Sequence, residues 1–331
     1  MMRKETDMNR RKAVLALSGT LLSPSWASAQ SPYPTKPIRV VVGVTPGGAG
    51  DILGRLFARS LSENGQNLYV DNKPGASGTL SADFVAKAAP DGYTLLVAAP
   101  TTMVVAPHLF KQLSFVPSRD LEPVALIGGG PLVLVVPSGL PVKSVADLVA
   151  YIRQAPPGSV AFGSGGRGTA SHLTAEAWAR TMGATLLHSP YKGDGQAVLD
   201  VMGGQVQFMF TGLNLVEPHI KSGRLRLLAV TGKSRFTTLP QVPTLDESGF
   251  KGFESLGWLG VYAPAKTPAP IIQKLAGEWD VARKTPAVSR VLDMAGMGAL
   301  SFNSPAEFAR FQQSEATRWA AVIKAAGIEP E

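Results

Sequence analysis

The chain has 331 residues, of which 45% are hydrophobic and 17% charged, and a formal net charge of +8. This length is enough for one large domain or two ordinary domains that bury their own cores. The 35 glycines and 26 prolines indicate many tight turns, and the mix excludes a coiled coil, a disordered chain and a multi-pass membrane protein. Because there is no cysteine, disulfides, thiolate metal sites and a cysteine nucleophile are excluded. The four histidines form no HxxxH-type pair, so neither a metal site nor another cofactor is expected.

Residues 1–29 have the three parts of a secretory signal. Arg10-Arg11-Lys12 precedes an apolar stretch of about ten residues, too short to span a bilayer. Ala27-Ser28-Ala29 is a small-x-small site, which predicts cleavage after Ala29 and a periplasmic protein. Export by the Sec or the Tat route stays open. The segment carries five basic and two acidic residues, so the remaining chain keeps a net charge of about +5. This remaining chain has no run of basic residues, and its charge therefore favours small anions over nucleic acid as the binding partner.

After the signal, short apolar strands alternate with helices, as in parallel α/β sheets. Strands are expected at 37–42, 68–70, 94–97, 132–136, 160–162, 185–187, 206–210, 225–230 and 259–262. Helices are expected from about 51, around 80–85, from a capping box at 144–147, at 169–182, 197–202 and 216–221, and three times after 268. The pattern predicts two α/β lobes, in which a ligand binds between the lobes at strand ends and helix N-termini.

A first glycine-rich turn, residues 45–51, lies between a predicted strand and a helix. Gly47, Gly48 and Gly50 allow the backbone to approach a ligand closely, and the helix start offers unpaired N–H donors. This combination predicts an anion site, with Asp51 as a cap or first-turn residue. A tight strand-to-helix connection is the alternative interpretation.

A second turn of this kind covers residues 163–169. Its glycines match G-x-G-x-x-G, but no acid follows about 20 residues later, so a nicotinamide site is rejected. Neither turn contains the Gly-Lys-Ser/Thr of a phosphate loop, and no G-x-S-x-G elbow is present. Two such turns, one per lobe, can share one carboxylate between two helix N-termini. The candidate ligand-binding residues of this turn are Ser164, Gly165, Gly166, Arg167, Gly168 and Thr169.

Taken with their spacing, these turns resemble the periplasmic solute-binding receptors of tripartite tricarboxylate transporters, the Bug family. The resemblance extends over nearly the whole chain after the signal. Further matching segments are Tyr33–Arg39, Asn72–Ala76, Pro90–Leu96, Pro190–Gly193, Gly203–Val206, Leu225–Thr231, Leu239–Thr244 and Ala326–Ile328.

The resemblance implies a two-lobed, type II periplasmic-binding-protein fold that closes by a hinge on a small carboxylate and delivers it to membrane transporter subunits. It implies a monomer without cofactor or enzymatic activity. The implied lobes are residues 30–133 and 257–331 for one and 134–256 for the other. It also adds Thr101, Thr102 and Thr211 to the ligand-binding candidates.

Two positions depart from the usual family pattern. Gly43-Val44-Thr45 stands where the family has an aromatic residue, which would widen the pocket, and Gln207 stands where the family often has an acid. Arg167 is either a carboxylate clamp or a solvated loop residue. A sensor that presents its closed form to a signalling partner is an alternative to the transport receptor. A hydrolase or isomerase using His172 or His188 would need a nucleophile and an acid that the sequence does not provide.

Overall fold

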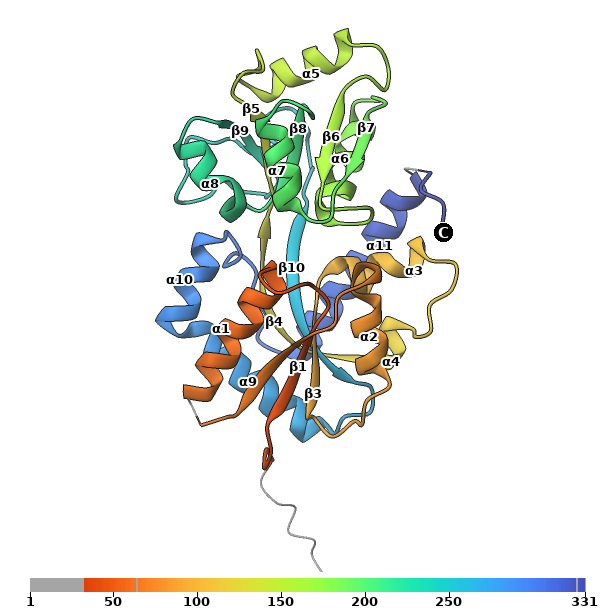
Figure 1. Cartoon of the computed structure of the whole chain (residues 1–331), viewed down its shortest axis with the longest axis vertical. Helices are drawn as coiled ribbons and strands as arrows, with labels where there is room; N and C mark the ends of the chain where they lie inside the picture. Colours follow the sequence, from red (N-terminus) through yellow and green to blue (C-terminus); the bar gives the residue numbers. More distant parts are fainter. Residues whose placement is uncertain (1–32, 64, 326, 331) are drawn as a thin grey trace, which may run out of the picture. The chain divides into compact units, whose positions relative to one another are not determined.

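The computed structural model describes residues 33–63, 65–325 and 327–330 (Figure 1). The predicted signal, residues 1–29, lies outside the described residues. Met1–Thr35 is a unit separate from Lys36–Glu331, and the fold described below is that of the second unit.

The first sheet has five strands in the order β2-β1-β3-β10-β4. Its strands are β1 (Ile38–Val42), β2 (Leu68–Asn72), β3 (Thr94–Ala98), β4 (Leu121–Pro131) and β10 (Leu256–Pro264). β1 pairs in parallel with β2 and β3, whereas β10 is antiparallel to both β3 and β4. Four strands therefore run in one direction, and β10 runs against them.

The second sheet repeats this plan in the order β7-β6-β8-β5-β9. Its strands are β5 (Val133–Pro137), β6 (Ala161–Ser164), β7 (Leu187–Pro190), β8 (Phe208–Thr211) and β9 (Leu225–Val230). β6 pairs in parallel with β7 and β8, and β5 is antiparallel to β8 and β9. The expected mainly parallel, two-lobed α/β fold is therefore confirmed, with one reversed strand in each of two mixed sheets.

Helices cover both faces of each sheet. In the first lobe they are α1 (Ala49–Glu63), α2 (Thr79–Ala86), α9 (Ala269–Lys284), α10 (Pro286–Met294) and α11 (Pro305–Ala325), with short helices at Ala76–Gly78, Thr101–Val105 (η2), Ala106–Leu109 (α3) and Pro117–Asp120. In the second lobe they are α5 (Val145–Gln154), α6 (Ala170–Thr181), α7 (Asp194–Met202) and α8 (Leu213–Lys221). α5 and α6 pack on one face of the second sheet, and α7 and α8 pack on the other.

Most expected elements are present, although two large apolar side chains on their helices are exposed. Ile52 of α1 is 52% exposed, and Leu80 of α2 is 58% exposed. α2 instead buries its small residue Ala82 together with Val85 against the first sheet. The exposed ring of Phe84 is covered by the cations of Arg39 and Lys73.

The strand β4, with eleven residues, was not expected. Its segment Gly128–Gly130 breaks the apolar pattern, since glycine is disfavoured in strands. The loop between α10 and α11 packs directly on these glycines: the Gly129 amide donates to the Met297 carbonyl at 2.8 Å. A Cβ on Gly130 would come within 1.7 Å of the Gly296 carbonyl oxygen. Tertiary packing therefore requires glycine here.

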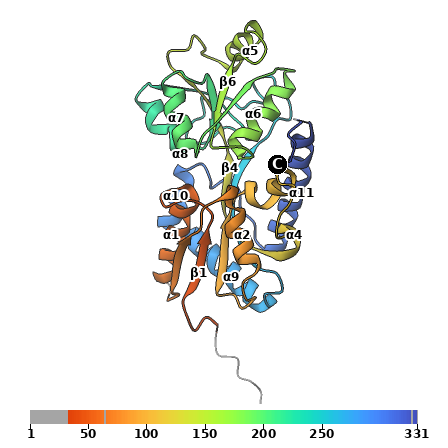
Figure 2. The ribbon, with the colours of Figure 1, turned by 45° about the vertical axis from the view of Figure 1, so that its right-hand side comes forward.

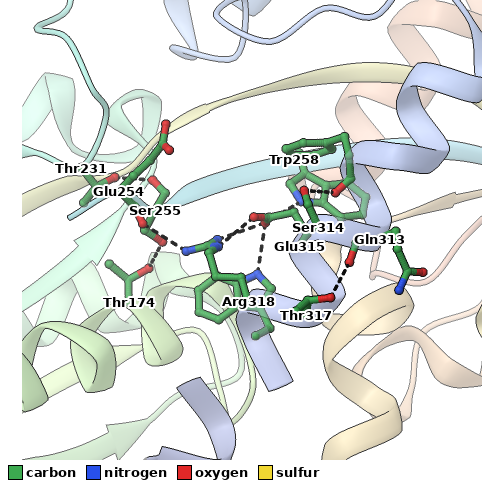
Figure 3. Close-up of polar contacts among 12 residues, drawn as sticks. Thr174, Thr231, Glu254, Ser255, Trp258, Gln313, Ser314, Glu315, Thr317 and Arg318 are labelled. Atoms are coloured by element: carbon green, nitrogen blue, oxygen red, sulfur yellow. Dashed lines mark hydrogen bonds and ion pairs between the residues drawn. The ribbon is translucent and has the colours of Figure 1, made fainter. Parts of the chain in front are cut away.

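The chain crosses from the first sheet to the second between β4 and β5, at Leu132, and returns between β9 and β10. The expected boundaries, 133/134 and 256/257, fall one residue inside β5 and β10. Thr231 ties the two crossings together. Its hydroxyl accepts from the Leu132 amide at 2.8 Å and donates to the Ser255 carbonyl at 2.5 Å (Figure 3).

Glu315 of α11 anchors the first lobe beside these crossings. Its buried carboxylate accepts from Arg318 at 2.8 and 3.0 Å and from the indole nitrogens of Trp258 and Trp319, both at 3.2 Å. Arg318 also donates to the Glu254 carbonyl in the return crossing at 3.1 Å (Figure 3). The carboxylate is satisfied by four donors, so burial of its charge is compensated.

Candidate functional site

The strand directions decide which loops of the two lobes face each other. β4 runs from the first sheet into β5, so β1, β2 and β3, which run with β4, also end toward the second sheet. β6, β7 and β8 run against β5 and therefore end toward the first sheet (Figure 1). The loops after β1, β3, β6 and β8 thus lie on facing edges. These loops, together with the strand ends before them and the helix starts after them, hold all the predicted ligand-binding residues.

The loop after β1 is held in shape by Asp51. One carboxylate oxygen accepts from the Gly47 amide at 2.9 Å, and the other accepts from Arg55 and Asn72, each at 2.9 Å. Gly47 has a φ of 87°, a conformation that favours glycine, and nothing lies within 4 Å of a Cβ built on it. Burial raises the pKa of the Asp51 carboxyl, but these hydrogen bonds outweigh burial and hold the pKa below its usual value.

The loop after β6 is held in shape by nearby side chains that accept hydrogen bonds from the loop's own backbone amides. The buried Ser164 hydroxyl accepts from the Gly166 amide at 3.1 Å, and Ser171 accepts from the Gly165 amide at 3.1 Å. His172 accepts from the Gly168 amide through Nδ1 at 3.0 Å. Thr169, predicted to bind the ligand and to begin the helix, instead precedes α6, and its side chain caps the helix by accepting from the amide of the third helical residue.

Two stacked histidines lie under this loop. The ring centroids of His172 and His188 are 3.9 Å apart, and His188 Nε2 lies 2.6 Å from the Ser164 hydroxyl. Burial is the main cause that lowers the pKa of His172 to about 3 and that of His188 to about 4, with smaller contributions from His188 to His172 and from the charge of Arg167 to both. Both rings are therefore neutral at pH 7 and fix the loop by hydrogen bonds.

The glycine amides predicted to cradle the ligand are thus largely occupied within the protein, and the open donors lie just beyond them. Among residues 33–63, 65–325 and 327–330, nothing accepts a hydrogen bond from the amides of Ala49 and Gly50 in α1 or of Ala170 and Ser171 in α6. These are the first two amides of two long helices, where the helix dipole is positive. The geometry is suited to an anion.

Asp194, which the sequence analysis did not single out, lies beside the second pair of amides. It is the first residue of α7, and its carboxylate accepts from the hydroxyls of Ser171 at 2.8 Å and Thr211 at 3.3 Å. Burial raises the pKa of the Asp194 carboxyl, and these hydrogen bonds offset burial only in part. No ion pair joins Asp194 to a cationic side chain in the described part of the chain.

The remaining predicted residues have structural contacts. Arg167 donates to the Glu329 carbonyl beyond α11 at 2.6 Å, so its guanidinium connects the second lobe to the C-terminal segment. The buried Thr102 donates to the Ser77 carbonyl at 2.9 Å, whereas Thr101 is partly exposed. Gly168, with a φ of 76°, packs against Leu109 of the first lobe: a Cβ there would come within 2.2 Å of its side chain.

The comparisons with known proteins show the family of the chain. The model of the tripartite tricarboxylate transporter family receptor matches residues 53–328. The chain belongs to this family. Protein BugT of Bordetella pertussis is 36% identical over 326 residues, which cover 98% of this chain and 99% of BugT.

Two solved structures of family proteins are similar throughout the fold. The R. palustris protein Rpa4515 with adipate is 34% identical with a TM-score of 0.83, covering 90% of this chain and 100% of that chain. MatC (Rpa3494) from Rhodopseudomonas palustris with bound malate is 30% identical with a TM-score of 0.78, covering 88% and 100%. The chain therefore has the two-lobed fold of the periplasmic binding proteins.

Members of this family are receptors, so the chain is a receptor and not an enzyme. The two histidines of the hydrolase alternative are loop supports, as described above. In the described residues, no helix has both the length and the apolar character needed to cross a membrane. The same described residues contain no cluster of three or more His, Asp or Glu side chains that could bind a metal ion.

Proposed function

We propose that this receptor captures a small carboxylate between its lobes in the periplasm and delivers it to the subunits of a tripartite transporter. One observation carries the proposal: two helix N-termini, one per lobe, each present two unpaired amides on facing edges of the sheets. Two similar structures, Rpa4515 with adipate and MatC with bound malate, support a carboxylate as the ligand class.

The donors are sufficient in number. A hydrogen bond to a charged group contributes about 1.5–3 kcal/mol, so four amides supply roughly 6–12 kcal/mol. A micromolar complex needs about 8 kcal/mol, and lobe closure and lost ligand motion reduce the net gain. Residues 30–133 with 257–331, and 134–256, would be the two closing bodies, with residues 1–29 removed during export. The receptor would act as a monomer.

Binding is tested by calorimetric titration of the purified protein, freed of ligand by unfolding and refolding, with small carboxylates and their neutral amides. Adipate and malate are the first probes, and the open alternatives, which include aromatic acids, follow. We expect micromolar binding of at least one acid and none of its amide. Binding of neutral compounds alone, or of no acid, would contradict the proposal.

Ala170→Pro tests the role of the amides directly. Proline fits the first position of a helix and removes only the N–H, and Thr169, with φ −69° and ψ 160°, already has the extended backbone that must precede proline. Loss of one hydrogen bond to a carboxylate predicts roughly 10- to 100-fold weaker binding. The matched control is Ala269→Pro, at the exposed first position of α9, which should bind as the wild type does.

A further inference from the structure

The carboxylate of Asp194 is unusual because it lies beside the predicted anion site. Ser171 links the two: its amide is one of the unpaired donors, and its hydroxyl donates to Asp194 at 2.8 Å. A second anion brought to the Ser171 amide is therefore repelled by the first unless a positive charge lies between them. In the described residues no lysine or arginine of the protein forms an ion pair that would supply that charge.

The polar groups around Asp194 are oriented as acceptors. Thr211 is fully buried, and it donates its only hydroxyl hydrogen to Asp194 at 3.3 Å, so it offers no donor to a ligand. Ser171 likewise donates to Asp194 and accepts from the Gly165 amide. A carboxylate has about four acceptor positions, and the two hydroxyls together with the Gly165 amide fill three of them, which leaves one for a ligand. The site thus pairs backbone donors with a cluster of acceptor oxygens a few ångströms away.

We propose that Asp194 makes the receptor selective for α-amino carboxylates, with the ligand's ammonium group bound to Asp194 while its carboxylate lies on the amides of α6. The inference rests on the proposed function. An ammonium group has three donors and no acceptor, which matches the partly exposed carboxylate of Asp194. The two charges of an α-amino acid are carried on one carbon, which matches the closeness of the Ser171 amide to the Asp194 carboxylate.

The alternative ligands match the site less well. A plain dicarboxylate offers no donor to Asp194 and would leave the charge there without a partner in a partly buried position. A 2-hydroxy acid offers one donor but no compensating charge. The closed complex would therefore rank the amino acid first, the hydroxy acid second and the unsubstituted acid last.

The test is a calorimetric titration with matched series that differ only in the group on the second carbon. The series are aspartate, malate and succinate; glutamate, 2-hydroxyglutarate and glutarate; and 2-aminoadipate with adipate. In the wild type we expect the amino member of the best-binding series to bind at least tenfold more tightly than the others. In Asp194→Asn this preference should disappear through weaker amino acid binding and stronger binding of the unsubstituted acid.

Asp200→Asn is the control, since it removes an acid from the same helix whose carboxylate accepts from the Tyr191 hydroxyl at 2.6 Å. It should keep the wild-type ranking, and far-ultraviolet circular dichroism should show all three proteins folded. Equal or tighter binding of unsubstituted acids by the wild type, or an amino preference that persists in Asp194→Asn, overturns the role of Asp194 while leaving the carboxylate receptor intact. If no acid of any series binds, the role of Asp194 is overturned, and the proposed function fails as well when the wider set of acids, aromatic acids included, also gives no binding.

Discussion

Each of the two glycine-rich loops is held by an aspartate, but the two aspartates are compensated differently. Asp51 accepts from a loop amide and is paired with Arg55, and the pKa of its carboxyl is held below the usual value despite burial. Asp194 accepts only from neutral groups, and burial raises the pKa of its carboxyl. The carboxylate of Asp51 thus has a cationic partner in Arg55, whereas the carboxylate of Asp194 has no cationic partner among the described residues. A cationic group of a ligand can take that place.

The loops differ also in how they pack, which predicts the largest effect. Gly168→Ala places a methyl group 2.2 Å from the buried Leu109 side chain and at a positive φ, whereas Gly47→Ala meets only the positive φ. We expect a loss in the free energy of unfolding of about 2–5 kcal/mol for Gly168→Ala and about 1–2 kcal/mol for Gly47→Ala. Urea unfolding at pH 7 measures both. Equal losses would show that the loop of the second lobe has room against the first lobe.

Acid should weaken the second loop through its histidines, which the first loop lacks. The pKa values of His172 and His188 are lowered to about 3 and 4, so the unfolded chain takes up protons first as the pH falls below about 6.5. Stability is complete above pH 6.5 and is lost on the way to pH 4, by about 2–4 kcal/mol for the pair at pH 4.5. Melting temperatures of the wild type between pH 7 and 4.5 should fall more steeply than those of the His172→Gln/His188→Gln double variant.

The two remaining histidines provide the control for this acid effect. The double variant His108→Gln/His219→Gln should melt with the pH dependence of the wild type. If it instead flattens the profile as much as the substitution of His172 and His188 does, the stacked pair is not the cause.

The smallest effect is expected where the first loop is made to resemble the second. Arg55→Met leaves the buried carboxylate of Asp51 without a cation, and should lower the free energy of unfolding at pH 7 by about 1 kcal/mol, because Arg55 itself is half-exposed. Since the lowered pKa of Asp51 stabilises the fold only above that pKa, the difference should shrink as the pH falls through it.

The exposed pair of Arg59 and Glu63, one turn further along α1, provides the control. Arg59→Met should change the free energy of unfolding, measured with urea, by less than about 0.5 kcal/mol, because surface pairs are weak. A loss for Arg59→Met equal to that for Arg55→Met would mean that burial of Asp51 adds nothing.

The sequence was informative where the signals were local. The two glycine-rich loops lie between an apolar strand and an amphipathic helix, and their residues are neighbours in the chain. Asp194 was missed because its partners Ser171 and Thr211 are 23 and 17 residues away. The helix it begins was expected only from 197. β4 was missed because Gly128–Gly130 satisfies no strand pattern and is explained only by the loop at Gly296 that packs on it. Local sequence patterns predict the two loops of the site, whereas contacts between distant residues decide which backbone amides remain without an acceptor.

The contacts of Glu315 with two tryptophans provide a way to observe the region where the lobes are joined. Glu315 lies on α11, the dark blue helix of the first lobe (Figure 2). The indole nitrogens of Trp258 and Trp319 both donate to its carboxylate. Its partner Arg318 donates to the Glu254 carbonyl in the return crossing (Figure 3). Indole emission responds to charge and hydrogen bonding close to the ring. The receptor therefore carries its own optical reporter where its lobes are joined, and a change in tryptophan fluorescence on adding an acid would record closure without any attached dye.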